Sequence, residues 1–459
     1  MTNWRKATLK QFGFWLAVIM LFYPRGGQSA DAPAPAIQMT RQATDPSATQ
    51  LLTLDDALLI ALDNHPNLQA ARERIAAQRA VLGQQMAAYY PTVSLANQYK
   101  TSQTQKAQDA HATPGSESYS SEAQFNFTLY NFGKREGAVQ AARETLNATD
   151  YNYQTTVDGV ILDVKLAYYV YLGAKAIVKV REEQVQSRDL LVRQARAFYE
   201  VGTRARIDVV RAESNLYTAQ ADLIATQNAV KIAWVTLKKA MGLRELPERP
   251  LVEEAIMTTI PYTLDQAKEI AYASRPELKS FGAQRKAQDQ NIATARRGHL
   301  PDLIFDASYG RKHDSNEAQT DPNRHLNTFP LQPAWSVTLS LNIPIFNGFL
   351  TTNKVEEALR NYYVIKSQEE QQRQQVALDV EQSYLRLVEL QERIKANEAA
   401  AKAAKENLDL ANGRYQVGVG SIIEVTDAQT LYTDAQTTYV RALYDYKIAD
   451  AQFTRAIGK

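Results

Sequence analysis

Residues 198–242 read FYEVGTRARIDVVRAESNLYTAQADLIATQNAVKIAWVTLKKAMG, and residues 414–458 read RYQVGVGSIIEVTDAQTLYTDAQTTYVRALYDYKIADAQFTRAIG. Each stretch opens with a Val-Gly turn and continues with a large apolar residue at every seventh position. These residues are Val209, Leu216, Leu223, Val230 and Leu237, then Val425, Tyr432, Tyr439, Tyr446 and Phe453, each followed three positions later by Ala or Thr. A seven-residue period makes helices supercoil, and small residues let a partner helix come close. Both stretches therefore predict helices that pack tightly against other helices.

The composition is that of an ordinary folded chain. Of the 459 residues, 45% are hydrophobic and 22% are charged, which argues against gross disorder. The absence of cysteine excludes disulfides, thiolate zinc sites, cysteine nucleophiles and a lipid-modified N-terminal cysteine. The five histidines lack metal-ligand spacing, and no catalytic constellation appears. We therefore predict no enzyme activity, no metal site and no cofactor.

Residues 1–30 have the pattern of a secretory signal peptide. Arg5, Lys6 and Lys10 precede an apolar run at 12–23, which is too short to span a bilayer as a helix. The alternative is a retained N-terminal anchor. Removing this segment takes away four basic residues and no acidic one, so the formal net charge changes from +2 to −2. Because no strong field of one sign remains, nucleic acid is not an expected partner.

The rest of the first half has an ordered series of patterns. An extended leader at 31–52 precedes a first repeat at 53–242, in which Thr53 caps a short helix and Pro66 separates it from a second helix. A β-hairpin follows at about 91–132, where Ala123, Phe125 and Phe127 alternate with polar residues. A long helical hairpin is expected at about 134–242. Its first helix is a rod of roughly 100 Å at 1.5 Å per residue, and the helix that returns is shorter. The second helix of the repeat could lie end to end with the returning helix and make up most of the difference.

The second half repeats this order. A proline-rich linker at 243–262 leads to a second repeat at 263–459, in which Thr263-Leu264-Asp265 matches Thr53-Leu54-Asp55. A β-hairpin is expected at about 301–346, with a last strand running from Trp335 to Ile345, and a helical hairpin at about 348–458. Landmarks that stay in register over about 210 residues indicate a tandem duplication.

Two hairpins supply only four strands, whereas the smallest membrane barrels use eight. An open sheet edge in a bilayer would leave backbone groups unpaired at several kcal/mol each. If these strands lie in a membrane, several copies of the chain must therefore close the sheet together. The apolar seams of the helices likewise require neighbouring helices on both sides.

Over essentially its full mature length, the chain resembles the TolC family of outer-membrane efflux channels. The resemblance rests on the duplicated unit, the paired Val-Gly turns, the segments Ile207-Asp208-Val209 and Ile423-Glu424-Val425-Thr426-Asp427, and the strand exits Tyr130-Asn131-Phe132-Gly133 and Phe346-Asn347-Gly348. It implies an α+β membrane fold: a homotrimer with a 12-stranded outer-membrane β-barrel, four strands per chain, continued by a periplasmic tunnel of twelve helical rods. It also implies an inner-membrane pump and a periplasmic adaptor as partners.

Three carboxylates at the tips of the helical hairpins are candidates for a selective gate. Glu424 and Asp427 lie one turn apart on one face, and Asp208 corresponds to Glu424 in the first repeat. In a trimer they would form rings that attract cations if that face lines the tunnel. A capping box, Ser421-Ile-Ile-Glu424, explains Glu424 equally well. Asp427 lies beyond that box, so we predict that it narrows the closed entrance.

The resemblance assigns two further roles to the tips. Tyr415 matches the family's gating tyrosine, but the gating arginine falls on Gly420, so the closed-state link is either absent or remade, with Arg204 or Arg206 as the candidates to replace it. The exposed turns resemble the family's adaptor-docking tips, with simple turn geometry as the alternative. The docking residues are Val201, Gly202, Thr203, Val417, Gly418 and Val419.

Three functions remain open from the sequence. The first is an outer-membrane exit duct that passes small toxic compounds or drugs, and the second is the same channel exporting a secreted protein. The third is a periplasmic coiled-coil adaptor or scaffold, with the strands in a soluble sheet. The aromatic residues of the strands would face outer-membrane lipid in the first two cases: Tyr99, Phe125, Phe127, Tyr309 and Trp335.

Overall fold

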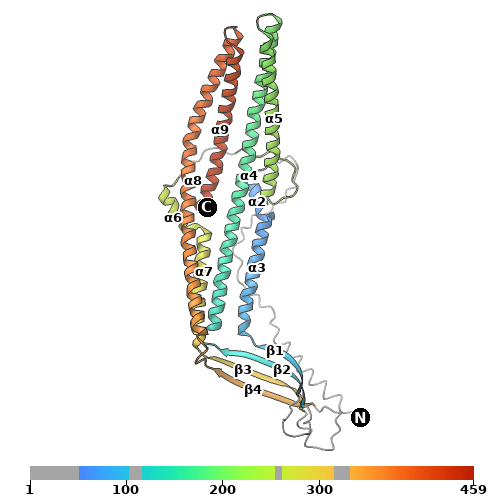
Figure 1. Cartoon of the computed structure of the whole chain (residues 1–459), viewed down its shortest axis with the longest axis vertical. Helices are drawn as coiled ribbons and strands as arrows, with labels where there is room; N and C mark the ends of the chain where they lie inside the picture. The colour runs from blue at the N-terminus through green and yellow to red at the C-terminus, as the bar shows by residue number, and fades with distance from the viewer. Residues whose placement is uncertain (1–50, 103–115, 254–260, 315–330) are drawn as a thin grey trace, which may run out of the picture. The chain divides into compact units, whose positions relative to one another are not determined.

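The computed structural model describes residues 51–102, 116–253, 261–314 and 331–459 (Figure 1). The expected signal peptide, nearly all of the leader, the tips of both β-hairpin loops and part of the linker lie outside these residues. The first repeat contains α2 (Leu54–Asn64), α3 (Pro66–Met86), β1 (Thr92–Ser102), β2 (Ser116–Tyr130), α4 (Lys134–Glu200) and α5 (Arg206–Ala240). The second contains α6 (Leu264–Ser274), α7 (Pro276–Arg296), β3 (Asp302–Asp314), β4 (Gln332–Asn342), α8 (Leu350–Gln416) and α9 (Ile422–Ala456). Short 3-10 turns, Ala87–Tyr89 and Arg297–His299, follow α3 and α7.

The two repeats begin with the same local chemistry. Thr53 accepts a hydrogen bond from the Asp56 backbone N–H, Thr263 accepts one from that of Gln266, and both form reciprocal capping boxes. Pro66 and Pro276 then occupy the first position of α3 and α7, where a missing N–H costs nothing. Each proline therefore ends one helix and begins the next.

The long helices carry the packing. α4 lies along α5 towards one end and along α3 and α7 towards the other, while α8 lies along α9 and α7 (Figure 1). Gly242 has φ +74°, and a Cβ there would stand 2.7 Å from the His65 Cα. The end of α5 thus abuts the α2–α3 junction, and Gly458 abuts Ser274 and Arg275 in the same way in the second repeat. This end-to-end stacking is how the shorter helices match the 67-residue rods.

The duplication extends to the hydrophobic core. Two buried clusters use residues at matching positions of the two repeats, and these residues are 3% exposed or less. The pairs are Ala57 with Ala267, Ala61 with Ala271, Val160 with Val376, and Val164 with Val380. The same apolar spacing therefore builds the same helix junction twice.

The strands form one antiparallel sheet in the order β1-β2-β3-β4. Its register places the apolar residues of all four strands on one face: Val93 pairs with Phe125, Ala123 with Tyr309, and Tyr309 with Trp335. That face is open, since Val93, Leu95 and Trp335 are 70–74% exposed. The other face is polar, with Asn126 donating to Asp306 and Ser308 bonded to Ser336.

The last strand is shorter than the sequence predicted. The alternation continues to Ile345, but β4 ends at Asn342 and Ile345 is 95% exposed. Pro344 explains the difference, because proline lacks the N–H that a ladder requires. Alternation of side chains alone could not reveal this end.

Candidate functional site

The tips of the two helical hairpins are tight, exposed turns. Gly202 and Gly418 have φ values of +79° and +84°, and a Cβ at either would meet no neighbour within 4 Å. Glycine is therefore favoured at both positions because the backbone has a positive φ, and not because neighbouring atoms leave no room for a side chain. Beside them, the side chains of Val201, Val417 and Val419 are 69–74% exposed. The tips present apolar side chains to their surroundings.

Below the tips, all four helices share one hydrophobic cluster. Its buried members come from α4 (Leu191, Val192, Ala195), α5 (Val209, Ala212, Leu216), α8 (Leu408, Ala411, Tyr415) and α9 (Ile422, Val425, Ala428). The two helical hairpins of one chain are thus packed together at this end. Moving the two tips apart would separate buried residues of this cluster.

A single arginine joins one tip to the other. The Arg204 Nη2 donates to the carbonyl oxygens of Gly418 at 3.0 Å and Gly420 at 2.7 Å. Its guanidinium also lies 5.3 Å from the ring centroid of Tyr415, which packs edge-on against Phe198. Of the two arginines expected to replace the family's gating residue, Arg204 makes this link. Arg206 has an exposed side chain.

The second tip has no room for an arginine. A Cβ on Gly420 would lie 2.9 Å from the Tyr415 N and 3.0 Å from the Arg414 carbonyl carbon. The Gly420 N–H donates to the Arg414 carbonyl at 2.8 Å, so the turn closes directly over the end of α8. Arg204 and Gly420 occupy equivalent positions of the two repeats, 216 residues apart. The arginine therefore extends from the first tip and reaches the backbone of the second.

Tyr415 lies at the centre of this link. Its side chain is 1% exposed, and its hydroxyl is buried without a hydrogen-bond partner. Burial raises the pKa of Tyr415, the nearby carboxylate of Asp208 raises it further, and Arg204 opposes the rise. The structure thus brings Asp208, Tyr415 and Arg204 together.

The other two candidate carboxylates lie on an open face of α9. Glu424 and Asp427 are both exposed, and neither is covered by the rest of the chain. Only half of the expected capping box forms: Ser421 accepts from the Glu424 backbone N–H at 3.2 Å. The Glu424 carboxylate instead accepts from the Arg414 Nε at 3.4 Å. A salt bridge with Arg414 has replaced the reciprocal bond to the cap.

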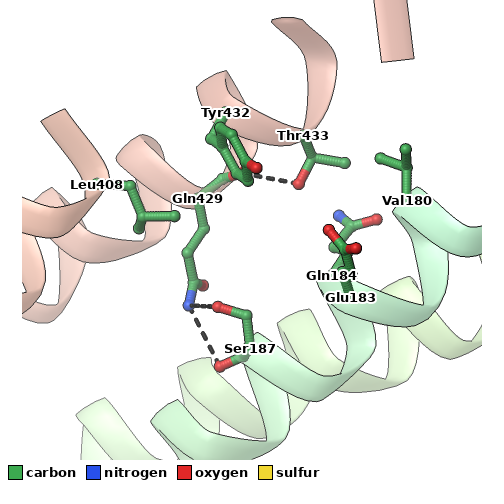
Figure 2. Close-up of a pocket in the computed structure, with 8 residues that line it drawn as sticks. All are labelled: Val180, Glu183, Gln184, Ser187, Leu408, Gln429, Tyr432 and Thr433. Carbon is green, nitrogen blue, oxygen red and sulfur yellow. Dashed lines mark hydrogen bonds between the residues drawn. The ribbon is translucent and has the colours of Figure 1, made fainter. Parts of the chain in front are cut away.

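A polar seam between α4 and α9 was not predicted. Arg188 donates to the Thr430 hydroxyl at 2.8 Å, and the Gln429 Nε2 donates to the Ser187 Oγ at 2.9 Å. Figure 2 shows Gln429 and Ser187 beside a cavity of about 40 Å³, enough for a water. In the sequence, Arg188 stands in a run of polar residues, and no periodic pattern of apolar residues marks it as buried.

Two features are absent from the residues that the structure describes. Within them, no helix is long and apolar enough to cross a membrane. In the same ranges, no three or more His, Cys, Asp or Glu side chains gather as metal ligands.

Comparison with known proteins places the chain in a family. The model of the outer membrane efflux protein family matches residues 58–243 and 269–459. The outer membrane protein TolC of Vibrio cholerae is 25% identical over 87% of this chain and 89% of its own length. The toluene efflux pump outer membrane protein TtgC of Pseudomonas putida is 22% identical over 94% and 87%.

The fold agrees with this assignment. The crystal structure of the outer membrane protein VceC from Vibrio cholerae superposes with a TM-score of 0.73, at 19% identity, over 88% of this chain and 96% of that one. The family match sets aside a periplasmic adaptor or scaffold. The chain belongs to the outer membrane efflux proteins, the exit ducts of efflux systems in the outer membrane.

Proposed function

We propose that three copies of this chain form a gated duct that passes small toxic compounds or drugs through the outer membrane. In this proposal the four-stranded sheets of the copies join into a 12-stranded barrel, and the helices enclose a periplasmic tunnel. An inner-membrane pump and a periplasmic adaptor deliver the cargo. Transport through the duct itself is passive.

The open sheet is the observation that carries the proposal. One face of the sheet exposes a continuous set of apolar side chains, and the outer edges of β1 and β4 pair with no other strand of the described residues. Lipid against that face and neighbouring strands at both edges would satisfy both needs. The free edges therefore support closure by further copies of the same chain.

The tips support adaptor docking and a gate at the same end. Exposed valines on rigid glycine turns offer an apolar surface for another protein. A few residues away, Arg204 holds the two tips together and would keep the entrance closed. The cargo class is supported by the Pseudomonas putida relative, which is an outer membrane protein of a toluene efflux pump. Export of a secreted protein through the same duct is the alternative.

The decisive experiment records single channels of the purified protein in a planar bilayer. Wild-type protein should form pores of small conductance, and Arg204→Ala should make larger openings more frequent. Hydrogen bonds to charged groups contribute about 1.5–3 kcal/mol each, and a loss of only 1.4 kcal/mol shifts an equilibrium tenfold. We therefore expect open events to rise by at least about tenfold.

Arg206→Ala is the matched control. Arg206 lies two residues after Arg204 and its side chain is exposed, so the variant removes the same charge without breaking the link between the tips. It should leave the opening frequency at the wild-type level. A protein that forms no pores would refute the duct. Pores with equal opening frequency in both variants would refute Arg204 as the closing link while leaving the duct intact.

A further inference from the structure

Arg188 is a buried cation with few acceptors. Its side chain, on α4, is 5% exposed and donates one hydrogen bond, from Nη2 to the Thr430 hydroxyl at 2.8 Å. Its Nε and Nη1 are buried without a hydrogen-bond partner. A guanidinium taken out of water and bonded to one neutral oxygen is costly unless a negative charge lies near it.

Asp427 supplies that charge. It precedes Thr430 by three residues on α9, so both lie on the same helix face. Burial lowers the pKa of the Arg188 guanidinium, and the negative charge of Asp427 opposes that fall. Asp427 itself is exposed on the side of α9 that the chain leaves open.

The distance between these two groups is held by neighbouring contacts. Gln429 is 3% exposed and donates to both the backbone oxygen and the hydroxyl of Ser187, the residue next to Arg188 (Figure 2). The bond between Arg188 and Thr430 adds a second tie between the same two helices. These bonds therefore hold α4 against α9 at the level of Arg188 and Asp427.

The other two candidate carboxylates also have arginine neighbours. Glu424 forms a salt bridge with Arg414 at 3.4 Å. Asp208 and Arg204 both act on Tyr415. Each predicted acidic position thus has a positive charge of its own chain close by.

We propose that Arg188 is a selectivity-determining residue of the duct, which compensates the charge of Asp427 from inside the helix bundle and keeps the entrance nearly neutral. This inference rests on the proposed function, because it needs a pore with Asp427 at its entrance. It differs from the simple expectation of a strongly cation-attracting ring of carboxylates. An entrance of this kind passes cations and anions with little preference.

The test measures reversal potentials of single pores under a salt gradient for four proteins: wild type, Arg188→Gln, Asp427→Asn and the double variant. Glutamine keeps a donor for Thr430 and removes the charge. In the proposed trimer, three charges lost within about one Debye length of the pore axis should raise the cation-to-anion permeability ratio by roughly threefold or more. Asp427→Asn should shift the ratio towards anions, because Arg188 is then uncompensated. The double variant should return close to wild type.

Arg193→Gln is the control on the same helix. Arg193 lies five residues further along α4 and is 75% exposed, so water and salt screen its charge and its loss should change the ratio much less than the loss of Arg188. Thr430→Val removes the hydrogen bond and keeps both charges, and it should leave the ratio unchanged.

The inference is overturned if Arg188→Gln has the wild-type ratio, or if Thr430→Val reproduces its effect. If Arg188→Gln does not fold, Asp427→Asn alone decides: a preference for anions supports compensation, and a residual preference for cations refutes it. Absence of pores in every protein, wild type included, would instead refute the duct on which the inference rests.

Discussion

At the scale of single residues, Gly420 lies where the backbone leaves no room for a side chain. The nearest atoms to a Cβ at this site are the backbone N of Tyr415 and the carbonyl carbon and Cβ of Arg414, which cannot swing away as the end of a side chain would. Gly420→Arg should therefore not restore a gating arginine. We expect it to destabilise the tip by roughly 1–3 kcal/mol, as overpacking commonly does. Hydrogen exchange should report faster opening at the α8–α9 turn.

Gly413→Ala is the matched control for that variant, because a Cβ there meets nothing within 4 Å and the site is inside α8. Helix propensity predicts a gain of about 0.5–1 kcal/mol. Slower exchange at the turn in Gly420→Arg than in wild type would contradict our account of the close approach.

Tyr415 leads to a second prediction at this scale. Because its hydroxyl is buried without a partner in the single chain, Tyr415→Phe removes an unsatisfied polar group and should leave stability equal or slightly higher. The sign of the pH effect follows from the raised pKa. The protonated phenol contributes stability below its ordinary value of about 10, and this is lost as the pH rises through the raised value.

Thermal unfolding of wild type and Tyr415→Phe from pH 8 to 11 measures this difference. The wild-type melting temperature should fall further than that of the variant above pH 10. If Tyr415→Phe instead opened the pore at neutral pH, the hydroxyl would have an acceptor on a neighbouring copy.

At the scale of elements, the junction at the end of α9 differs from its counterpart at the end of α5. Arg275, 3% exposed, donates to the Ala456 carbonyl at 3.2 Å and bonds to Asp379 and Glu277, so α6, α7, α8 and α9 meet at one side chain. The side chain of the matching residue of the first repeat, His65, accepts from the Asn67 backbone N–H at 3.2 Å. The second junction is therefore ionic and the first is not.

Asp158 of α4 lies beside that ionic junction. Burial raises its pKa first, Glu277 raises it further, and Arg455 and Arg275 oppose the rise. The protonated carboxyl stabilises the fold at low pH, and this stability is lost as the pH rises through the raised pKa. Asp158→Asn should therefore raise the melting temperature at pH 7 by about 1–2 °C and have no effect near pH 3. Differential scanning calorimetry of both proteins at the two pH values measures this.

Asp163→Asn is its control, on the same helix with an exposed side chain, and should change nothing at either pH. A fall in the Asp158→Asn melting temperature at pH 7 would mean that its arginine neighbours outweigh burial.

The elements also show what sequence reasoning could reach. The heptads, the capping threonines and the prolines are local signals, and they predicted the helical hairpins whose seam residues Ala212, Ala219 and Ala428 are 3% exposed or less. Contacts between hairpins are not local. Arg204 and Arg206 are two residues apart and chemically equal in the sequence, and only the packing of one tip on the other distinguishes them. Arg188 was missed for the same reason.

At the scale of the whole molecule, the sheet's two free edges allow a test of assembly that uses the absence of cysteine. β1 and β4 are separated by two strands, so their backbones lie about 14 Å apart within one chain. A disulfide needs Cα atoms within about 7 Å. A cysteine on β1 and one on β4 can therefore join only if they belong to different copies.

We expect Ser94→Cys, combined in turn with a cysteine at Ser336, Thr338 or Ser340, to form a disulfide in at least one pairing. These residues lie on the polar face of the sheet. Gel electrophoresis without reductant should show chains linked up to three and no further, because a closed ring of three leaves no free edge. Each single-cysteine variant should stay unlinked. A ladder that continues beyond three, or no link in any pairing, would mean that the edges close in another way.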